Sequence, residues 1–99
     1  MPLTETQKKH LRGLAHTRRP IVMIGQQGLK ETIFEELEAA LAYHELVKIK
    51  ISVGDRAARD EALEELRRRC GAELVQRVGN TAVLFRRNPK KPRIELPRG

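Results

Sequence analysis

The sequence predicts an α/β fold whose elements follow the order α-β-α-β-α-β-β. Two observations lead to this class. Amphipathic segments with helical spacing alternate with short strand-like segments, and a Gly-Asn pair separates the last two strand-like segments. The 99 residues are enough for one compact domain and too few for two. Because strand–helix–strand units pair their strands in parallel through right-handed crossovers, the second and third helices are expected on one face of the sheet.

The first helix is expected to begin near Glu5, since Thr4 and Gln7 have the spacing of a capping box. Its apolar stripe is formed by Leu11, Leu14 and Ala15. The residue before Pro20 is pushed out of helical geometry, so the helix ends in this region. The apolar run that follows, residues 21–24, is interpreted as a buried strand. The first helix has to cover another part of the sheet or its edge, and the sequence leaves its position open.

The second helix follows residues 25–28, and its apolar stripe is formed by Ile33, Phe34, Leu37, Ala40 and Leu41. The next segment, residues 45–53, alternates with the period of a strand. One side carries Val47, Ile49, Ile51 and Val53, and the other carries Lys48, Lys50 and Ser52. The apolar side is expected to face the second and third helices.

The third helix is expected to begin after Asp55, a good N-cap residue, and to end at Gly71. Its inner face is formed by Ala58, Ala62, Leu63 and Leu66, and its last turn carries Arg67, Arg68 and Arg69. Two short strands, residues 73–78 and 81–86, surround a Gly-Asn pair that is typical of a hairpin turn.

The chain is interpreted as one domain over residues 1–87 and a basic, proline-containing arm over residues 88–99. The arm is expected to be extended and to become ordered on contact with a partner. Ile94 and Leu96 could instead dock it as an edge strand.

The charge is segregated along the chain, and this indicates a polyanionic partner. The formal net charge is +7. Residues 1–20 carry five basic side chains and one glutamate, residues 21–47 carry one lysine and five glutamates, and residues 86–99 carry six basic side chains and one glutamate. Such a distribution favours one face that attracts nucleic acid and another that does not.

The stretch Gly25-Gln26-Gln27-Gly28 is the strongest candidate for a binding site. A strand that ends in Gly-x-x-Gly and opens a helix leaves backbone N–H groups pointing outward, and the helix dipole adds partial positive charge there. This combination binds phosphate, and bare glycines let a nucleic-acid backbone approach closely. A turn glycine followed by a glycine near a helix start is the purely structural alternative. The segment has neither the third glycine of a dinucleotide fingerprint nor the lysine of a P-loop.

Basic residues are expected to hold neighbouring phosphates of the same nucleic acid. The candidates are Lys8, Lys9, Arg12, Arg18, Arg19, Lys48, Lys50, Arg86 and Arg87. The three aromatic residues are too few for a surface that stacks several single-stranded bases, and Phe34 is assigned to the core. Recognition of the backbone and shape of structured RNA is therefore favoured. Duplex DNA is a weaker option, because the chain has no helix-turn-helix pattern.

Catalysis, a metal, a cofactor and a small-molecule substrate are not expected. The three histidines show no metal-ligand spacing with the single cysteine, Cys70, and the only serine, Ser52, has no nucleophile motif. The sequence contains no apolar run of about 20 residues, the length of a membrane span. The polar N-terminal segment and the lone cysteine are typical of a cytoplasmic protein. A monomer is expected.

Five separated blocks resemble the bacterial YhbY family of stand-alone CRM domains: QKKHLRGLAH, PIVMIGQQGL, HELVKIKI, GNTAVLFRR and ELPRG. The resemblance implies a two-layer α/β sandwich with a four-stranded mixed sheet, the last strand antiparallel to the others, similar to the C-terminal domain of translation initiation factor three. It also implies RNA binding through residues 25–28 and the basic surface beside them. Many members of that family carry a lysine or other polar residue inside this loop, whereas Gln26 and Gln27 add no charge. The flanking cations would then supply more of the attraction.

The resemblance further implies that the RNA is ribosomal RNA in precursors of the large subunit and that the protein aids ribosome assembly without catalysis. Two alternatives stay open. One is a protein-interaction module whose acidic second helix docks a basic ribosomal protein. The other is an RNA-processing enzyme.

Overall fold

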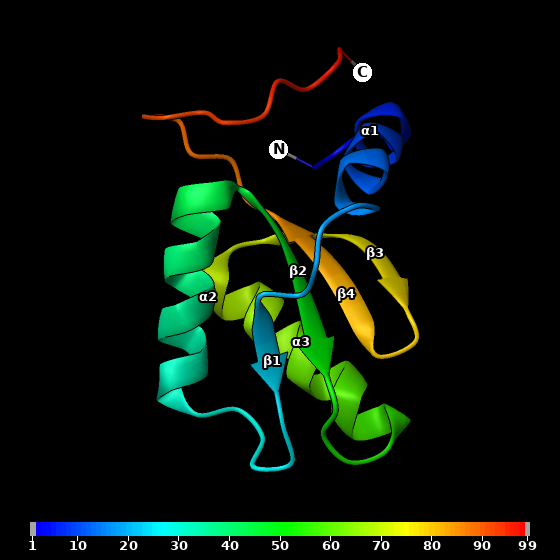
Figure 1. Ribbon diagram of the computed structural model, residues 1–99, viewed down its shortest axis with the longest axis vertical. Helices are drawn as coiled ribbons and strands as arrows, with labels where there is room; N and C mark the ends of the chain where they lie inside the picture. Colours follow the sequence, from blue (N-terminus) through cyan, green and yellow to red (C-terminus); the bar gives the residue numbers. More distant parts are fainter. Residues whose placement is uncertain (1, 99) are drawn as a thin grey trace.

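Seven elements follow one another in the predicted order in a computed structural model that describes residues 2–98 (Figure 1). They are α1 (Glu5–Ala15), β1 (Val22–Ile24), α2 (Glu31–His44), β2 (Leu46–Ile51), α3 (Arg56–Cys70), β3 (Glu73–Val78) and β4 (Thr81–Phe85).

The four strands form one mixed sheet with the spatial order β1-β2-β4-β3. β1 and β2 are parallel, and β4 is antiparallel to both of its neighbours, β2 and β3. The last strand is therefore antiparallel to the other three, as the resemblance implied. The hairpin between β3 and β4 turns at Gly79 and Asn80, as predicted.

The main core lies between the sheet and the helices α2 and α3, which cover the same face, as predicted (Figure 1). Alternate residues of β2 point into it, because side chains of a strand alternate between the two faces. The buried residues of this core are Val22, Ile24, Phe34, Leu37, Leu41, Val47, Ile49, Ile51, Ala62, Leu63, Leu66, Cys70, Ala72, Ala82 and Leu84. Phe34 thus lies in the core, as expected.

Helix α1 packs on the opposite face of the sheet, near the start of β2 and the end of β4. The second cluster of buried residues consists of Leu11, Ala15, Leu46, Val75, Val83, Phe85 and Ile94. Leu46 and Phe85 are paired across β2 and β4, so α1 covers this end of the sheet and leaves the other end of the same face open. The position of α1, which the sequence left open, is set by these long-range contacts.

The helix ends follow the sequence signals. Thr4 and Gln7 form the predicted capping box at the start of α1, and the Asp55 carboxylate accepts a hydrogen bond of 2.9 Å from the N–H of Ala58. Gly71 ends α3 in a left-handed conformation with φ of 61°. Such a backbone favours glycine because other residues are strained there.

The prediction of a buried strand over residues 21–24 is wrong for half of its residues. Val22 and Ile24 are buried, but Ile21 is 51% exposed and Met23 is 62% exposed. β1 is an edge strand, and α1 lies too far along the sheet to cover its second face. A run of four apolar residues does not reveal that only one face of the strand is covered.

The segment after β4 forms no helix or strand among the described residues, and it still lies against the domain. Ile94 is buried in the second cluster, but residues 93–97 form no strand, so the segment does not dock as the edge strand considered above. The side-chain amide of Gln7 also donates a 3.0 Å hydrogen bond to the carbonyl of Pro97. The division of the chain at residue 87 stays a prediction.

A buried glutamate holds this segment in place. The carboxylate of Glu45, which is fully buried, accepts hydrogen bonds from the backbone N–H groups of Asn88 (2.6 Å), Arg93 (2.6 Å) and Ile94 (2.8 Å). Burial alone would raise the pKa of Glu45, but these three bonds and the charge of Arg87 lower the pKa below its ordinary value of 4.5. We call this arrangement the Glu45 latch.

Candidate nucleic-acid interface

The Gly25–Gly28 segment forms an exposed turn at the end of β1. The N–H of Gly28 donates to the carbonyl of Gly25 at 3.0 Å, and Gly28 has a φ of 77°. Within residues 2–98, the backbone N–H groups of Gln26 and Gln27 donate to no protein acceptor. The side-chain amide of Gln26 donates to the carbonyl of Ser52 at 2.8 Å and ties the turn to the loop after β2. The turn therefore presents two backbone donors to solvent.

The sequence-based view that this turn opens a helix needs correction. Helix α2 begins at Glu31, and Leu29 and Lys30 separate it from the turn. Lys30 is its N-cap residue and makes no side-chain capping bond. The N-terminus of α2 thus keeps its partial positive charge close to the turn without being part of it.

One edge of the sheet gathers the turn and both helix starts. β1 and β2 run parallel and end there, so the loops that lead into α2 and α3 lie side by side, with the β3–β4 turn next to them (Figure 1). The carbonyl of Asn80 in that turn accepts a 2.7 Å hydrogen bond from Ile51, the last residue of β2. We call this end, with residues 25–28, 52–55 and 79–80, the glycine edge.

Four of the predicted cations lie on β2 or beside its start: Lys48 and Lys50 belong to the strand, and Arg18 and Arg19 lie in the segment before β1. We call Arg18, Arg19, Lys48 and Lys50 the β2 track. Lys50 is paired with Met23, two residues before Gly25, which places its Cα about 7 Å along the strand from the turn. Arg18, Arg19 and Lys48 surround a hollow of about 300 Å³.

Two members of the track also have structural contacts. The guanidinium of Arg18 donates to the carbonyl of Leu46 at 2.8 Å, and the ammonium of Lys48 lies 3.4 Å from the carbonyl of Arg18. These contacts fix the loop before β1 against β2. Lys50 and Arg19 are exposed, and Lys50 is the cation of the track nearest to the turn.

The structure does not bring the other predicted cations to the glycine edge. Lys8, Lys9 and Arg12 belong to α1, which packs at the opposite end of the sheet (Figure 1). Arg86 and Arg87 follow the end of β4, next to Phe85. Arg86 is bound to the Glu38 carboxylate at 2.8 Å and to the carbonyl of Cys70 at 3.0 Å, which gives it a structural role.

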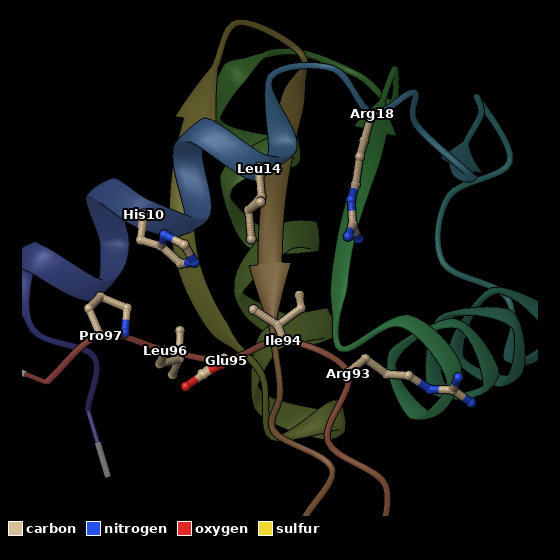
Figure 2. A pocket seen from close by; sticks show the side chains of 8 residues that line it. All are labelled: His10, Leu14, Arg18, Arg93, Ile94, Glu95, Leu96 and Pro97. Atoms are coloured by element: carbon tan, nitrogen blue, oxygen red, sulfur yellow. The ribbon is translucent and has the colours of Figure 1, made fainter.

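A shallow groove of about 550 Å³ lies at this opposite end, between α1 and the docked segment (Figure 2). Leu14 from α1 and Ile94 from the docked segment point toward each other across it, and Arg18 lies at its border. The groove therefore connects α1 with the start of the β2 track.

Sequence reasoning missed three arginines at the glycine edge. Arg56 and Arg59 lie in the first turns of α3, and Arg77 lies in β3, where it pairs with Asp60 of the same helix. The spacing of Arg56 and Arg59 places both on one side of a helix start, and that was a usable signal. The proximity of Arg77 depends on the packing of β3 beside α3 and had no local signal.

The remaining reactive groups have structural surroundings. Cys70 is buried, and burial, followed by the charge of Glu38, raises the pKa of its thiol. Among residues 2–98, no three His, Cys, Asp or Glu side chains are grouped closely enough to hold a metal ion. In the same part of the chain, no helix combines the length and the apolar character needed to cross a bilayer.

Known proteins are similar to this chain in sequence. A protein from Haemophilus influenzae named RNA-binding protein is 40% identical over 96 residues, covering 97% of this chain and 96% of its own. A protein from Pseudomonas aeruginosa named probable RNA-binding protein is 39% identical over 90 residues, covering 91% of this chain and 86% of its own. Neither name describes an enzyme.

A solved structure agrees with the architecture. The solution structure of a Staphylococcus aureus protein, described as a candidate RNA-binding protein, superposes with a TM-score of 0.81 and 34% identity, covering 97% of this chain and 100% of its own. The family model of the CRS1/YhbY (CRM) domain matches residues 3–86. The chain described here belongs to the CRS1/YhbY (CRM) domain family.

Proposed function

We propose that this protein binds structured RNA through the glycine edge and the β2 track, and that it does so without catalysis. The observation that carries the proposal is the exposed Gly25–Gly28 turn, whose two open backbone donors lie beside a line of cations. The names of the relatives support RNA as the ligand.

The turn and the track would contact the sugar-phosphate backbone. The N–H groups of Gln26 and Gln27 would donate to one phosphate, and the ammonium of Lys50 would neutralise the next. Lys48 and Arg19 would continue this contact along β2. Because each phosphate contact releases a counterion, the affinity is expected to fall steeply as salt increases.

A charge placed in the turn tests this proposal. Gly25 has no positive φ, and a Cβ added to it meets nothing within 4 Å, so Gly25→Asp introduces a carboxylate without backbone strain. Ala39→Asp is the matched control, because it adds the same charge at an exposed position of α2. Gly25→Asp is expected to weaken binding of a fluorescein-labelled ribosomal RNA hairpin by about tenfold or more, since like charges would face each other. Equal affinities of the two variants in fluorescence anisotropy would contradict the proposal.

We further propose that the RNA is ribosomal RNA in precursors of the large subunit, bound by a monomer in the cytoplasm. The resemblance of the five sequence blocks to YhbY proteins supports this assignment. Crosslinking in cells followed by sequencing of the attached RNA is expected to yield large-subunit ribosomal RNA. Reads spread evenly over messenger RNAs would contradict it.

Charge-reversal variants distinguish this proposal from the alternative of a protein-interaction module. Glu38 is engaged by Arg86, so Glu35 and Glu36 are the better residues for reversing the charge of the acidic helix. Docking of a basic ribosomal protein through α2 would be lost in Glu35→Lys/Glu36→Lys and kept in Lys48→Glu/Lys50→Glu. We expect association with ribosomal particles to be kept in Glu35→Lys/Glu36→Lys and lost in Lys48→Glu/Lys50→Glu.

A further inference from the structure

A cleft of about 310 Å³ lies at the glycine edge between the start of α3 and the β3–β4 turn. It is lined by Arg56, Arg59, Arg77, Gly79 and Asn80. The two lining residues of the turn are small or neutral, so the polar surface of the cleft is dominated by three guanidinium groups.

The hydrogen bonds of these groups are incomplete. Arg59 donates from Nη1 to the carbonyl of Gly54 at 3.0 Å, but its Nε is buried and donates to no acceptor within residues 2–98. Buried donors in native proteins nearly always have an acceptor, so the hydrogen bonds of Arg59 are not complete within the described residues. Arg77 is paired with Asp60, and Arg56 is exposed to solvent.

The electrostatic field of the cleft favours an anion. Its nearest carboxylate, Asp60, is engaged by Arg77, and the Asp55 carboxylate is engaged by the N–H of Ala58. The hydrogen bond from Arg77 is the main reason that the pKa of Asp60 lies below its ordinary value of 3.8, and the charges of Arg56 and Arg59 add to it. All three arginines therefore act on one small region, where the start of α3 adds partial positive charge.

We propose that this cleft, which we call the arginine cleft, binds a phosphate of the same RNA that the Gly25–Gly28 turn contacts. The inference rests on the proposed function. Phosphate accepts bidentate hydrogen bonds from the planar guanidinium, and the exposed Arg56, which lines the cleft, offers such a group.

The spacing of the two sites suits one RNA. Ile51 is paired with Ile24, the residue before the glycine turn, and its N–H is bound by the carbonyl of Asn80 in the cleft wall. The cleft and the turn lie at the same edge and are separated by the width of the sheet, about 14 Å for three strand spacings. A folded RNA that contacts the turn thus extends over the cleft.

The test compares two double variants that remove the same charge from the same helix. Arg56→Gln/Arg59→Gln empties the cleft of two cations, whereas Arg67→Gln/Arg68→Gln removes two arginines that pair with Glu64 and Glu65 at the far end of α3. Affinity for the labelled ribosomal RNA hairpin is measured by fluorescence anisotropy over a range of salt concentrations. Circular dichroism verifies that both variants are folded.

The cleft variant is expected to lower the slope of log affinity against log salt by about one, and to weaken binding about five- to tenfold at 0.1 M salt. The control variant is expected to keep the wild-type slope. In the wild-type protein, the Nε–Hε signal of Arg59 in nuclear magnetic resonance spectra is expected to shift when the hairpin is added. This second measurement does not depend on any variant.

Three outcomes would overturn the inference. The two double variants could weaken binding equally, which would leave only net charge as the cause. RNA affinity could stay unchanged in the cleft variant while Gly25→Asp loses it, which would remove the cleft from the RNA site and keep the proposed function. Poly-glutamate could bind wild type and not the cleft variant, with RNA affinity unaffected, which would make the cleft a site for acidic peptides. Failure of wild type to bind RNA would refute the proposed function itself.

Discussion

The Glu45 latch can be weakened by replacing one carboxylate oxygen of Glu45 with an amide group. Glu45→Gln keeps the length of the side chain and the backbone preference at this position, where φ is 63°. The remaining carbonyl oxygen can still accept from Arg93 and Ile94, but the new amide group faces the N–H of Asn88, another donor. One hydrogen bond to a charged group is lost, and a buried donor stays without an acceptor.

The magnitude follows from these contacts. A hydrogen bond to a charged group contributes about 1.5–3 kcal/mol, so we expect the free energy of unfolding to fall by about 2 kcal/mol. For a domain of this size, such a loss corresponds to a decrease in Tm of about 8–16 °C. Detachment of the segment after β4 would limit this loss of stability, because its freed N–H groups can then be hydrated.

The assay combines thermal unfolding, followed by circular dichroism, with amide hydrogen exchange. Glu36→Gln is the control, since Glu36 is an exposed glutamate of α2. In Glu45→Gln, the amide protons of Arg93 and Ile94 should exchange much faster than in wild type. The reasoning is refuted if both variants have the same Tm and these amides exchange at the wild-type rate.

Two further predictions concern the latch and the turn. The pKa of Glu45 is lower in the folded chain than its ordinary 4.5, so its stabilising contribution is complete above that value and is lost as the pH falls through the lower, folded pKa. Acid titration should therefore release the segment around Ile94 in wild type, seen as sharpened signals in nuclear magnetic resonance spectra, and a pH-independent segment would contradict this. Gly28→Ala should destabilise the fold by about 1–2 kcal/mol because of its positive φ, whereas Gly25→Ala should be neutral in a urea titration. Equal stability of the two variants would show that the φ of Gly28 carries no strain.

Local signals predicted the elements well because each depends on neighbouring residues. The capping box at Thr4, the N-cap at Asp55 and the left-handed Gly71 are determined by hydrogen bonds and backbone angles within a few residues. The alternation over β2 also identified Val47 as a core residue on the side of α2 and α3.

Features that depend on distant segments could not be predicted in the same way. The pairing of β2 with β4 instead of β3 decides the strand order, and the position of α1 depends on Leu46 and Phe85 being left uncovered. Glu45 was counted only as one of the five glutamates of residues 21–47, because its three donors lie more than 40 residues further along the chain.

The candidate site was predicted only in part, because some of its residues are brought together by contacts between distant segments. The Gly25–Gly28 turn and Lys50 lie close together because β1 and β2 are parallel, which the crossover rule predicts. A net charge, however, carries no information on position. The charge distribution led us to group Lys8 with the turn, although α1 packs at the other end of the sheet. It gave no reason to select Arg59.

The closeness of the two chain ends, where Leu3 and Leu96 pack against the same cluster, has a practical consequence. The N–H of Leu3 donates to the Glu73 carboxylate at 2.8 Å, and Gln7 donates to Pro97, so both ends are held beside α1 (Figure 1). A fluorophore or a surface linker joined to either end would stand far from the Gly25–Gly28 turn and leave it accessible. The same closeness makes the domain suitable for circular permutation, with a short peptide joining the old ends and new ones opened in an exposed loop.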